Sequence, residues 1–179
     1  MKKTLYLEKS VGGGRGGEWV RELDLDGVER IVVGMGPGSF AGVRSALAFA
    51  QGYATASGCE VLGLPSPAAM VREGDGPLAV VGDARQGKFW IALFEGFRQI
   101  GGVFQVDGRE SLGKSVPRQA RVVSPDDGRI GEILRELFGE NYEPGRLPDA
   151  EGLRRFAEAA GESALIPQPR PIYLNPAVR

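Results

Sequence analysis

The chain has 179 residues, of which 42% are hydrophobic and 25% are charged, and its formal net charge is −1. These values predict one globular domain or two small lobes, and they give no electrostatic case for direct nucleic-acid binding, which normally requires a basic face. There is no histidine, and Cys59 is the only cysteine, so an intrachain disulfide, the histidine-dependent catalytic triads and the usual zinc sites are excluded.

The amino-terminal region predicts no targeting signal. Lys2 and Lys3 resemble the basic start of a signal peptide, but only a few apolar residues follow before Glu8. The longest weakly polar stretch, Val43 to Ala56, contains Arg44 and is too short to cross a bilayer. We therefore expect a cytoplasmic protein that makes no contact with a membrane.

The first elements predict the start of a sheet. Thr4 to Glu8 shows the apolar alternation of a short strand, and Gly12 to Gly17 form a flexible loop. Glu18 to Leu23 fit one or two helical turns. Val28 to Met35 is a nearly continuous apolar run, which is typical of a strand buried on both faces.

A turn and a long helix follow this strand. The sequence Gly-Pro-Gly-Ser-Phe at positions 36–40 predicts a sharp turn, and its serine is a competent N-cap for a helix over 41–57. Gly58 is well placed to end that helix, and Cys59 to Leu64 returns as a strand. This strand–turn–helix–strand order is typical of a parallel α/β unit.

The rest of the chain predicts a second set of short elements. A short helix follows Pro65, and the polar segment 73–77 reads as a linker at which we place a lobe boundary. Strands are expected at 78–81, 88–95, 103–106 and 120–123, a turn at 83–87, and helices at 130–138 and 153–161.

The helix over 41–57 is apolar on nearly all sides. A surface helix of a monomer keeps a wide polar face, so this pattern favours a helix that packs on its own sheet and meets another protein on its other side. The alternative is a helix enclosed within its own domain. The residues expected at the partner interface are Val43, Ala46, Leu47, Phe49, Ala50, Gly52, Tyr53 and Ala56.

The turn at 36–40 supports a competing hypothesis, a small nucleotide- or anion-binding enzyme. Free backbone N–H groups at a helix N-terminus form a natural anion site, although neither the full dinucleotide fingerprint nor the phosphate-loop lysine is present. Glu8 or Asp83 would then act as an acid or a metal ligand, although Asp83 also fits ordinary turn chemistry. The expected anion contacts are Gly36, Gly38, Ser39, Arg44 and Asp83.

Several motifs together resemble the TsaB (YeaZ) family. The block at 36–40, followed by Gly42 to Arg44, looks like the signature turn and helix start of that family. Leu62 to Leu64 and Asp83 to Arg85 occur in the family's order and spacing, and 171–174 is similar to its closing Tyr-Leu segment. The resemblance is good from position 31 to about position 94 and moderate over the last ten residues.

The resemblance implies a fold and a role. The fold is that of the actin-like ATPase superfamily, an α/β architecture of two lobes on ribonuclease-H-like mixed sheets, here 1–76 with about 162–179, and 77–161. The role is that of a non-catalytic partner of TsaD, the subunit that transfers a threonylcarbamoyl group to the adenosine beside the tRNA anticodon. The ATPase TsaE would be a further partner, tRNA would be contacted only through the complex, and the isolated chain would form a homodimer. This role requires no catalytic residue, metal or cofactor.

One departure from the family pattern concerns the amino terminus. Glu8 stands where the family's first strand usually leads into an aspartate. The family then has two further strands and a long helix, whereas here only 9–27 precede the buried strand, so the hairpin and the first helix are expected to be reduced. A diverged homodimeric paralogue without a role in tRNA modification is therefore a third hypothesis.

Overall fold

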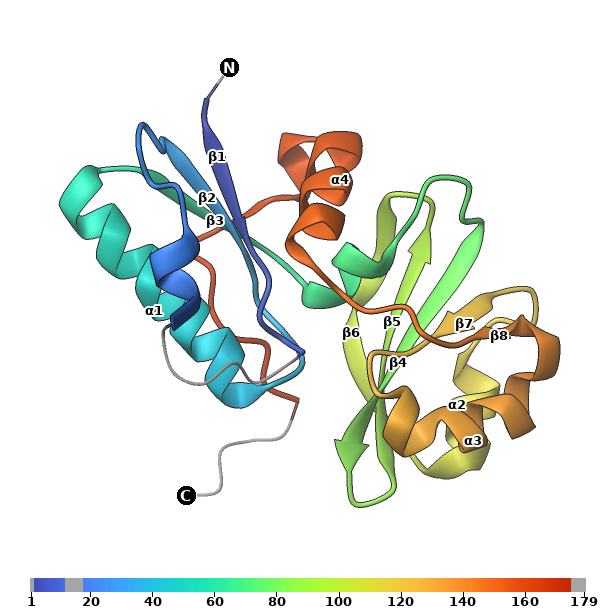
Figure 1. Cartoon of the computed structure of the whole chain (residues 1–179). Coiled ribbons are helices and arrows are strands. Elements are labelled where there is room, and N and C mark those ends of the chain that lie inside the picture. The colour runs from blue at the N-terminus through green and yellow to red at the C-terminus, as the bar shows by residue number, and fades with distance from the viewer. Residues whose placement is uncertain (1, 12–17, 175–179) are drawn as a thin grey trace. The chain divides into compact units, whose positions relative to one another are not determined.

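Two sheets, each with its own helices, make up the computed structural model, which describes residues 2–11 and 18–174 (Figure 1). The first unit comprises Met1–Ala69 and Pro148–Tyr173, and the second comprises Met70–Leu147. The glycine loop expected at 12–17 lies outside the described residues. Within the described part of the chain, no helix is both long and apolar enough to cross a membrane.

The sheet of the first unit has the order β1-β2-β3-β9. Strands β1 (Thr4–Leu7), β2 (Arg30–Gly34) and β3 (Glu60–Leu64) run parallel, and β9 (Ile166–Pro167) pairs antiparallel with β3. Among the described residues, only the 3₁₀ helix η1 (Glu18–Glu22) separates β1 from β2, as expected for a reduced N-terminal hairpin and helix.

Helices lie on both sides of this sheet (Figure 1). Helix α1 (Phe40–Ser57) packs on β2 and β3, while α4 (Ala150–Ala160) packs on β1 and β2. The sequence division places the residues of α4 in the second lobe, whereas their packing on β1 and β2 assigns this helix to the first unit. Two short 3₁₀ helices complete the unit, η2 (Ser66–Met70) and η4 (Glu162–Ala164).

The second unit is built on a five-stranded mixed sheet of order β6-β5-β4-β7-β8. Strands β4, β5 and β6 form an antiparallel meander, and β7 and β8 extend it in parallel on the β4 side. The bounds are β4 (Pro77–Arg85), β5 (Lys88–Glu95), β6 (Arg98–Asp107), β7 (Arg121–Val123) and β8 (Tyr142–Glu143).

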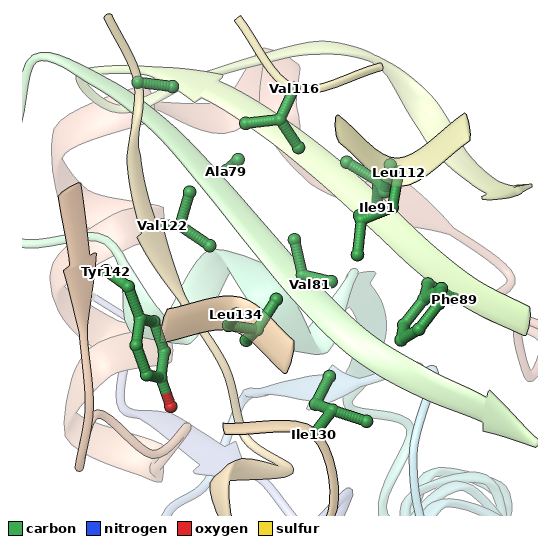
Figure 2. Packing of buried hydrophobic residues seen from close by; sticks show 11 residues of the cluster. Ala79, Val81, Phe89, Ile91, Leu112, Val116, Val122, Ile130, Leu134 and Tyr142 are labelled. Atoms are coloured by element: carbon green, nitrogen blue, oxygen red, sulfur yellow. The ribbon is translucent and has the colours of Figure 1, made fainter. Parts of the chain in front are cut away.

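Two helices, α2 (Gly108–Ser115) and α3 (Asp127–Phe138), supply side chains to the core of the second unit, and η3 (Gly139–Asn141) follows α3. Figure 2 shows Leu112 of α2 and Leu134 of α3 within the same cluster as Val81 and Ile91 of the sheet. All four side chains are fully buried. Burial of apolar side chains is the main source of stability in a small unit and contributes roughly 25 cal/mol per Å² of apolar surface removed from water.

Apart from the shortest strands and 3₁₀ helices, the elements differ from the sequence prediction most clearly in three places. Strand β4 continues to Arg85, so the turn expected at 83–87 is reduced to Gln86 and Gly87. Strand β6 spans ten residues instead of the four expected. Helix α2 was not predicted, because Leu112 is the only large apolar residue in its eight and two glycines weaken its helical propensity.

Candidate functional site

Helix α1 begins and ends where its capping residues dictate. The Ser39 hydroxyl accepts a hydrogen bond from the Gly42 N–H at 3.2 Å, which satisfies one of the unpaired donors of the first turn. At the other end Gly58 adopts the left-handed conformation, and its N–H donates to the Ala54 carbonyl. The predicted helix is thereby confirmed, with Phe40 added at its start.

One face of α1 is buried within its own unit. Val43, Ala46, Leu47 and Ala50 are almost fully buried in the core that α1 forms with β1 and β2. The sequence prediction placed these four residues at a partner interface. That prediction is wrong for these four residues, because a side chain enclosed in its own core is not available to another protein.

Phe49 and Tyr53 lie between the buried and the exposed faces. Their rings stack with centroids 6.2 Å apart, and both pack against the edge of the same core. The Tyr53 hydroxyl donates a hydrogen bond to the Leu25 carbonyl at 2.9 Å. This bond fixes the Tyr53 ring, so these two predicted interface residues can contribute only their outer edges to a partner.

The opposite face of α1 is exposed and made of small residues. Gly52 and Ala56, which were predicted at the interface, lie here, and a Cβ atom at Gly52 would meet no atom within 4 Å. Small side chains let another helix approach closely, and a helix face of this kind is seldom left facing water. We call this face the exposed α1 face; its small residues are Ala41, Ser45, Ala48, Gly52 and Ala56.

An aromatic and cationic cluster marks the start of this face. Phe40 is 62% exposed and Tyr173 is 56% exposed, and their ring centroids lie 5.9 Å apart. The Arg44 guanidinium lies 4.9 Å from the Phe40 ring centroid, in a cation–π contact. Exposed aromatic and arginine side chains are the types that dominate binding energy at protein interfaces. Sequence reasoning had included Phe40 and Tyr173 in motifs but not in the interface.

Two backbone donors of the turn at 36–40, and one of the helix start after it, are already engaged. The Gly36 N–H donates to the Ser66 hydroxyl at 2.9 Å, and the Ser39 N–H donates to the Ser10 carbonyl at 2.6 Å. The Gly42 N–H is held by the Ser39 hydroxyl, as described above. These three amides are therefore not available to an anion.

The segment after β1 lies directly on this turn. A Cβ atom at Gly38 would collide with Ser10, and one at Gly42 would collide with the Lys9 carbonyl oxygen. The glycines of the motif therefore allow the backbone at 9–10 to approach the start of α1. This packing role accounts for both glycines without a bound anion.

Glu8 and Ser10 form a buried polar pair beneath the turn. Glu8 is 8% exposed, and one of its carboxylate oxygens accepts a hydrogen bond from the Ser10 N–H at 2.6 Å. The other oxygen, Oε2, and the Ser10 hydroxyl have no hydrogen-bond partner among the described residues. Burial raises the pKa of the Glu8 carboxyl group, and the hydrogen bond from the Ser10 N–H offsets part of that effect.

Asp83 belongs to the second unit, and its carboxylate is engaged locally. One oxygen accepts a hydrogen bond from the Arg85 N–H at 2.8 Å, and the other lies 3.1 Å from Nε of Arg129. The Asp83 N–H in turn donates to the Asp126 carboxylate at 2.9 Å. These contacts are the turn chemistry that the sequence allowed for. Among the described residues, no group of three or more acidic or cysteine side chains is placed to hold a metal ion.

Comparisons with known proteins converge on one family. The model of the TsaD family, tRNA N6-adenosine threonylcarbamoyltransferase, matches residues 21–124, which is more than half of the chain. Uncharacterized proteins of Mycobacterium tuberculosis and Mycobacterium bovis are 36% identical to this chain over 80 residues. That stretch covers 44% of this chain but only 38% of the length of those relatives.

Solved structures share the fold. An uncharacterized protein with similarity to peptidase YeaZ from Pseudomonas aeruginosa superposes with a TM-score of 0.71 at 23% identity, over 98% of this chain and all of that one. YeaZ from Pseudomonas aeruginosa gives a TM-score of 0.65 at 24% identity, over 87% of this chain and 78% of its own. The predicted ribonuclease-H-like, actin-like α/β fold is thereby confirmed.

Proposed function

Since this chain belongs to the TsaD and TsaB (YeaZ) family of the tRNA threonylcarbamoyladenosine machinery, we propose that it is a non-catalytic subunit that binds a TsaD-type partner through the exposed α1 face. The observation that carries the proposal is that face itself, a full-length row of small side chains bordered by exposed aromatic rings. Small side chains add little stability to a helix that faces water, but they allow close packing when a second helix covers that face.

The polar groups that were considered as candidate anion contacts, acids or metal ligands support a non-catalytic role. The chain contains no histidine, so the commonest general base is missing from the whole sequence. The Gly36 and Ser39 amides and the Asp83 carboxylate are each engaged by neighbouring groups. Glu8 is buried beneath the turn, where it meets the protein interior instead of a substrate.

The proposal also covers the location of the complex and its further partners. The complex would act on tRNA in the cytoplasm, with a TsaE-type ATPase as a further partner and with tRNA contacted through the assembled subunits. Two copies of the chain would pair through the same face when no TsaD-type partner is present. The diverged homodimer without a tRNA role differs from this proposal only in the identity of the partner.

The test is a bulky substitution in the middle of the exposed α1 face. Ala48→Trp places an indole where a partner helix would approach, and we expect binding of the purified TsaD homologue from the same genome to weaken at least ten-fold, about 1.4 kcal/mol. Ala159 is an exposed alanine on α4 of the same unit, so Ala159→Trp is the matched control and should bind normally. Isothermal titration calorimetry measures both.

A charged residue at Ala50 would not provide this test. Ala50 is fully buried, so a charge there would unfold the unit and would say nothing about a partner. Equal affinities for Ala48→Trp, Ala159→Trp and the unchanged chain would refute the proposed face.

A further inference from the structure

The C-terminal segment, 168–173, lies beside α1 within the first unit and contacts this helix at its start and in its second half. The Gln51 side-chain amide donates to the Pro169 carbonyl at 3.5 Å, and the Tyr173 ring contacts the Phe40 ring. Between these contacts the Ile172 N–H donates to the Met35 carbonyl at 2.8 Å. A partner that covers α1 would therefore also meet this segment.

A surface pocket of about 460 Å³ opens between the second half of α1 and this segment. Five of the residues that line the pocket are polar or carry a thiol. They are Gln51 and Thr55 of α1, Cys59 immediately before β3, and Gln168 and Arg170 of the C-terminal segment. Gln51 and Thr55 are exposed on α1. The pocket is therefore continuous with the exposed α1 face.

The charges along this surface have one sign. Arg44 is the only charged residue of α1, and the sequence from Leu165 to Arg179 contains two arginines, Arg170 included, and no acidic residue. Neither Arg44 nor Arg170 has a carboxylate within 4.0 Å among the described residues, in contrast to Arg30 and Arg154 of the same unit. Most of the other basic side chains that this structure describes are paired, so these two guanidinium groups are free to meet a carboxylate of another molecule.

The pocket has the chemistry of a carboxylate site. A guanidinium offers a planar fork of donors that matches a carboxylate, and the amide groups of Gln51 and Gln168 can donate further hydrogen bonds. No residue that lines the pocket is acidic, so a carboxylate entering it meets no like charge.

We propose that this pocket receives the carboxylate of an aspartate or glutamate of the TsaD-type partner, with Arg170 as its main contact; the inference rests on the proposed function. The same charges make a second copy the weaker partner for this surface, because each copy would bring arginines and no carboxylate. An acidic partner surface has the complementary charge. The pocket thereby favours a heterologous partner over a second copy of this chain.

The test is charge reversal at the pocket. Arg170 is exposed and makes no ion pair with the described residues, so Arg170→Glu should fold normally, which circular dichroism checks. Titration against the TsaD homologue from the same genome should show affinity reduced at least ten-fold for Arg170→Glu and less for Arg170→Lys, which keeps the charge but not the fork. Arg118→Glu, an exposed arginine in the second unit, is the matched control and should change affinity less than two-fold.

The outcomes separate the two proposals. If the unchanged chain binds the TsaD homologue and Arg170→Glu binds it equally well, the carboxylate site is overturned and the proposed function stands. Absence of binding by the unchanged chain overturns both. Loss of affinity in Arg118→Glu equal to that in Arg170→Glu also contradicts the site, because the effect would then follow net charge and not the pocket.

Discussion

Glu8 illustrates how far a residue type alone can mislead. Its place at the end of β1 suggested an acid or a metal ligand, but its carboxyl group is buried with one oxygen unpartnered among the described residues. Its other oxygen accepts from Ser10, whose carbonyl accepts from the N–H of Ser39, the N-cap of α1. Glu8 thus holds the start of α1 through the backbone of the segment that follows β1.

This arrangement predicts a pH dependence of stability. Because burial raises the pKa of Glu8 in the folded state, the folded chain binds the proton more tightly than the unfolded chain does. The contribution of Glu8 to the free energy of unfolding should therefore be highest below the unfolded-state pKa of about 4.3 and fall as the pH rises through the raised pKa. The loss amounts to about 1.4 kcal/mol for each pH unit between the two pKa values.

Glu8→Gln isolates this effect, because the amide keeps an acceptor for the Ser10 N–H and cannot ionise. At pH 8 the variant should be more stable than the unchanged chain, and the two should converge near pH 4. Urea denaturation at a series of pH values measures the difference in free energy of unfolding between the variant and the unchanged chain. The contributions of all other titrating groups cancel in this difference. A variant that is less stable at every pH would contradict the account.

At the scale of the element, α1 makes opposite use of two of its glycines. Gly42 faces the backbone of Lys9, whereas Gly52 faces open space. Alanine is the better helix former by about 1 kcal/mol, so Gly52→Ala should raise the free energy of unfolding by up to about that amount. Gly42→Ala should lower it by roughly 1–3 kcal/mol, because the added methyl group must displace the backbone at 9–10.

Thermal and urea denaturation of the two variants provide the measurement. Each variant serves as the control for the other, since the substitution and the helix are the same. Equal stabilisation by both would mean that the segment after β1 does not pack on the start of α1.

The limits of α1 could be predicted from the sequence, but its faces could not. Ser39 and Gly58 are residues with strong capping preferences, so the helix ends followed from local chemistry. Ala46 is buried and Ala48 is exposed, although both are the same residue in the same helix. The position of the sheet determines which of the two alanines is buried. A helix that is apolar on nearly all sides has no hydrophobic periodicity from which its buried face could be predicted.

At the scale of the whole molecule, local patterns predicted contacts between elements close in sequence better than contacts between distant ones. The apolar run at β2 and the turn after it predicted a parallel unit, which β1, β2 and β3 form. Helix α4 was correctly expected as a helix but grouped with the wrong neighbours, because its partners β1 and β2 are distant in sequence. Arg146 gave no sign of burial, yet it is 2% exposed and pairs with Asp75 at 2.6 Å.

The family resemblance rested on short motifs with defined physical roles. The block at 36–40 forms a turn in which Gly38 allows close approach of the segment after β1, and the matched region, 21–124, includes this turn. The pocket beside Arg170 could not be predicted, because it joins α1 to a segment more than one hundred residues later in the sequence. Sites of this kind depend on tertiary contacts that no local pattern encodes.

The central claim, that this chain is a partner subunit, is tested most directly by size-exclusion chromatography with light scattering. The chain is measured alone and mixed in equal amounts with the TsaD homologue from the same genome. Our account predicts a new species with the mass of a one-to-one complex, and any homodimer of the chain alone should disappear from the mixture. Separate elution of the two proteins at micromolar concentrations, with the masses unchanged, would contradict it.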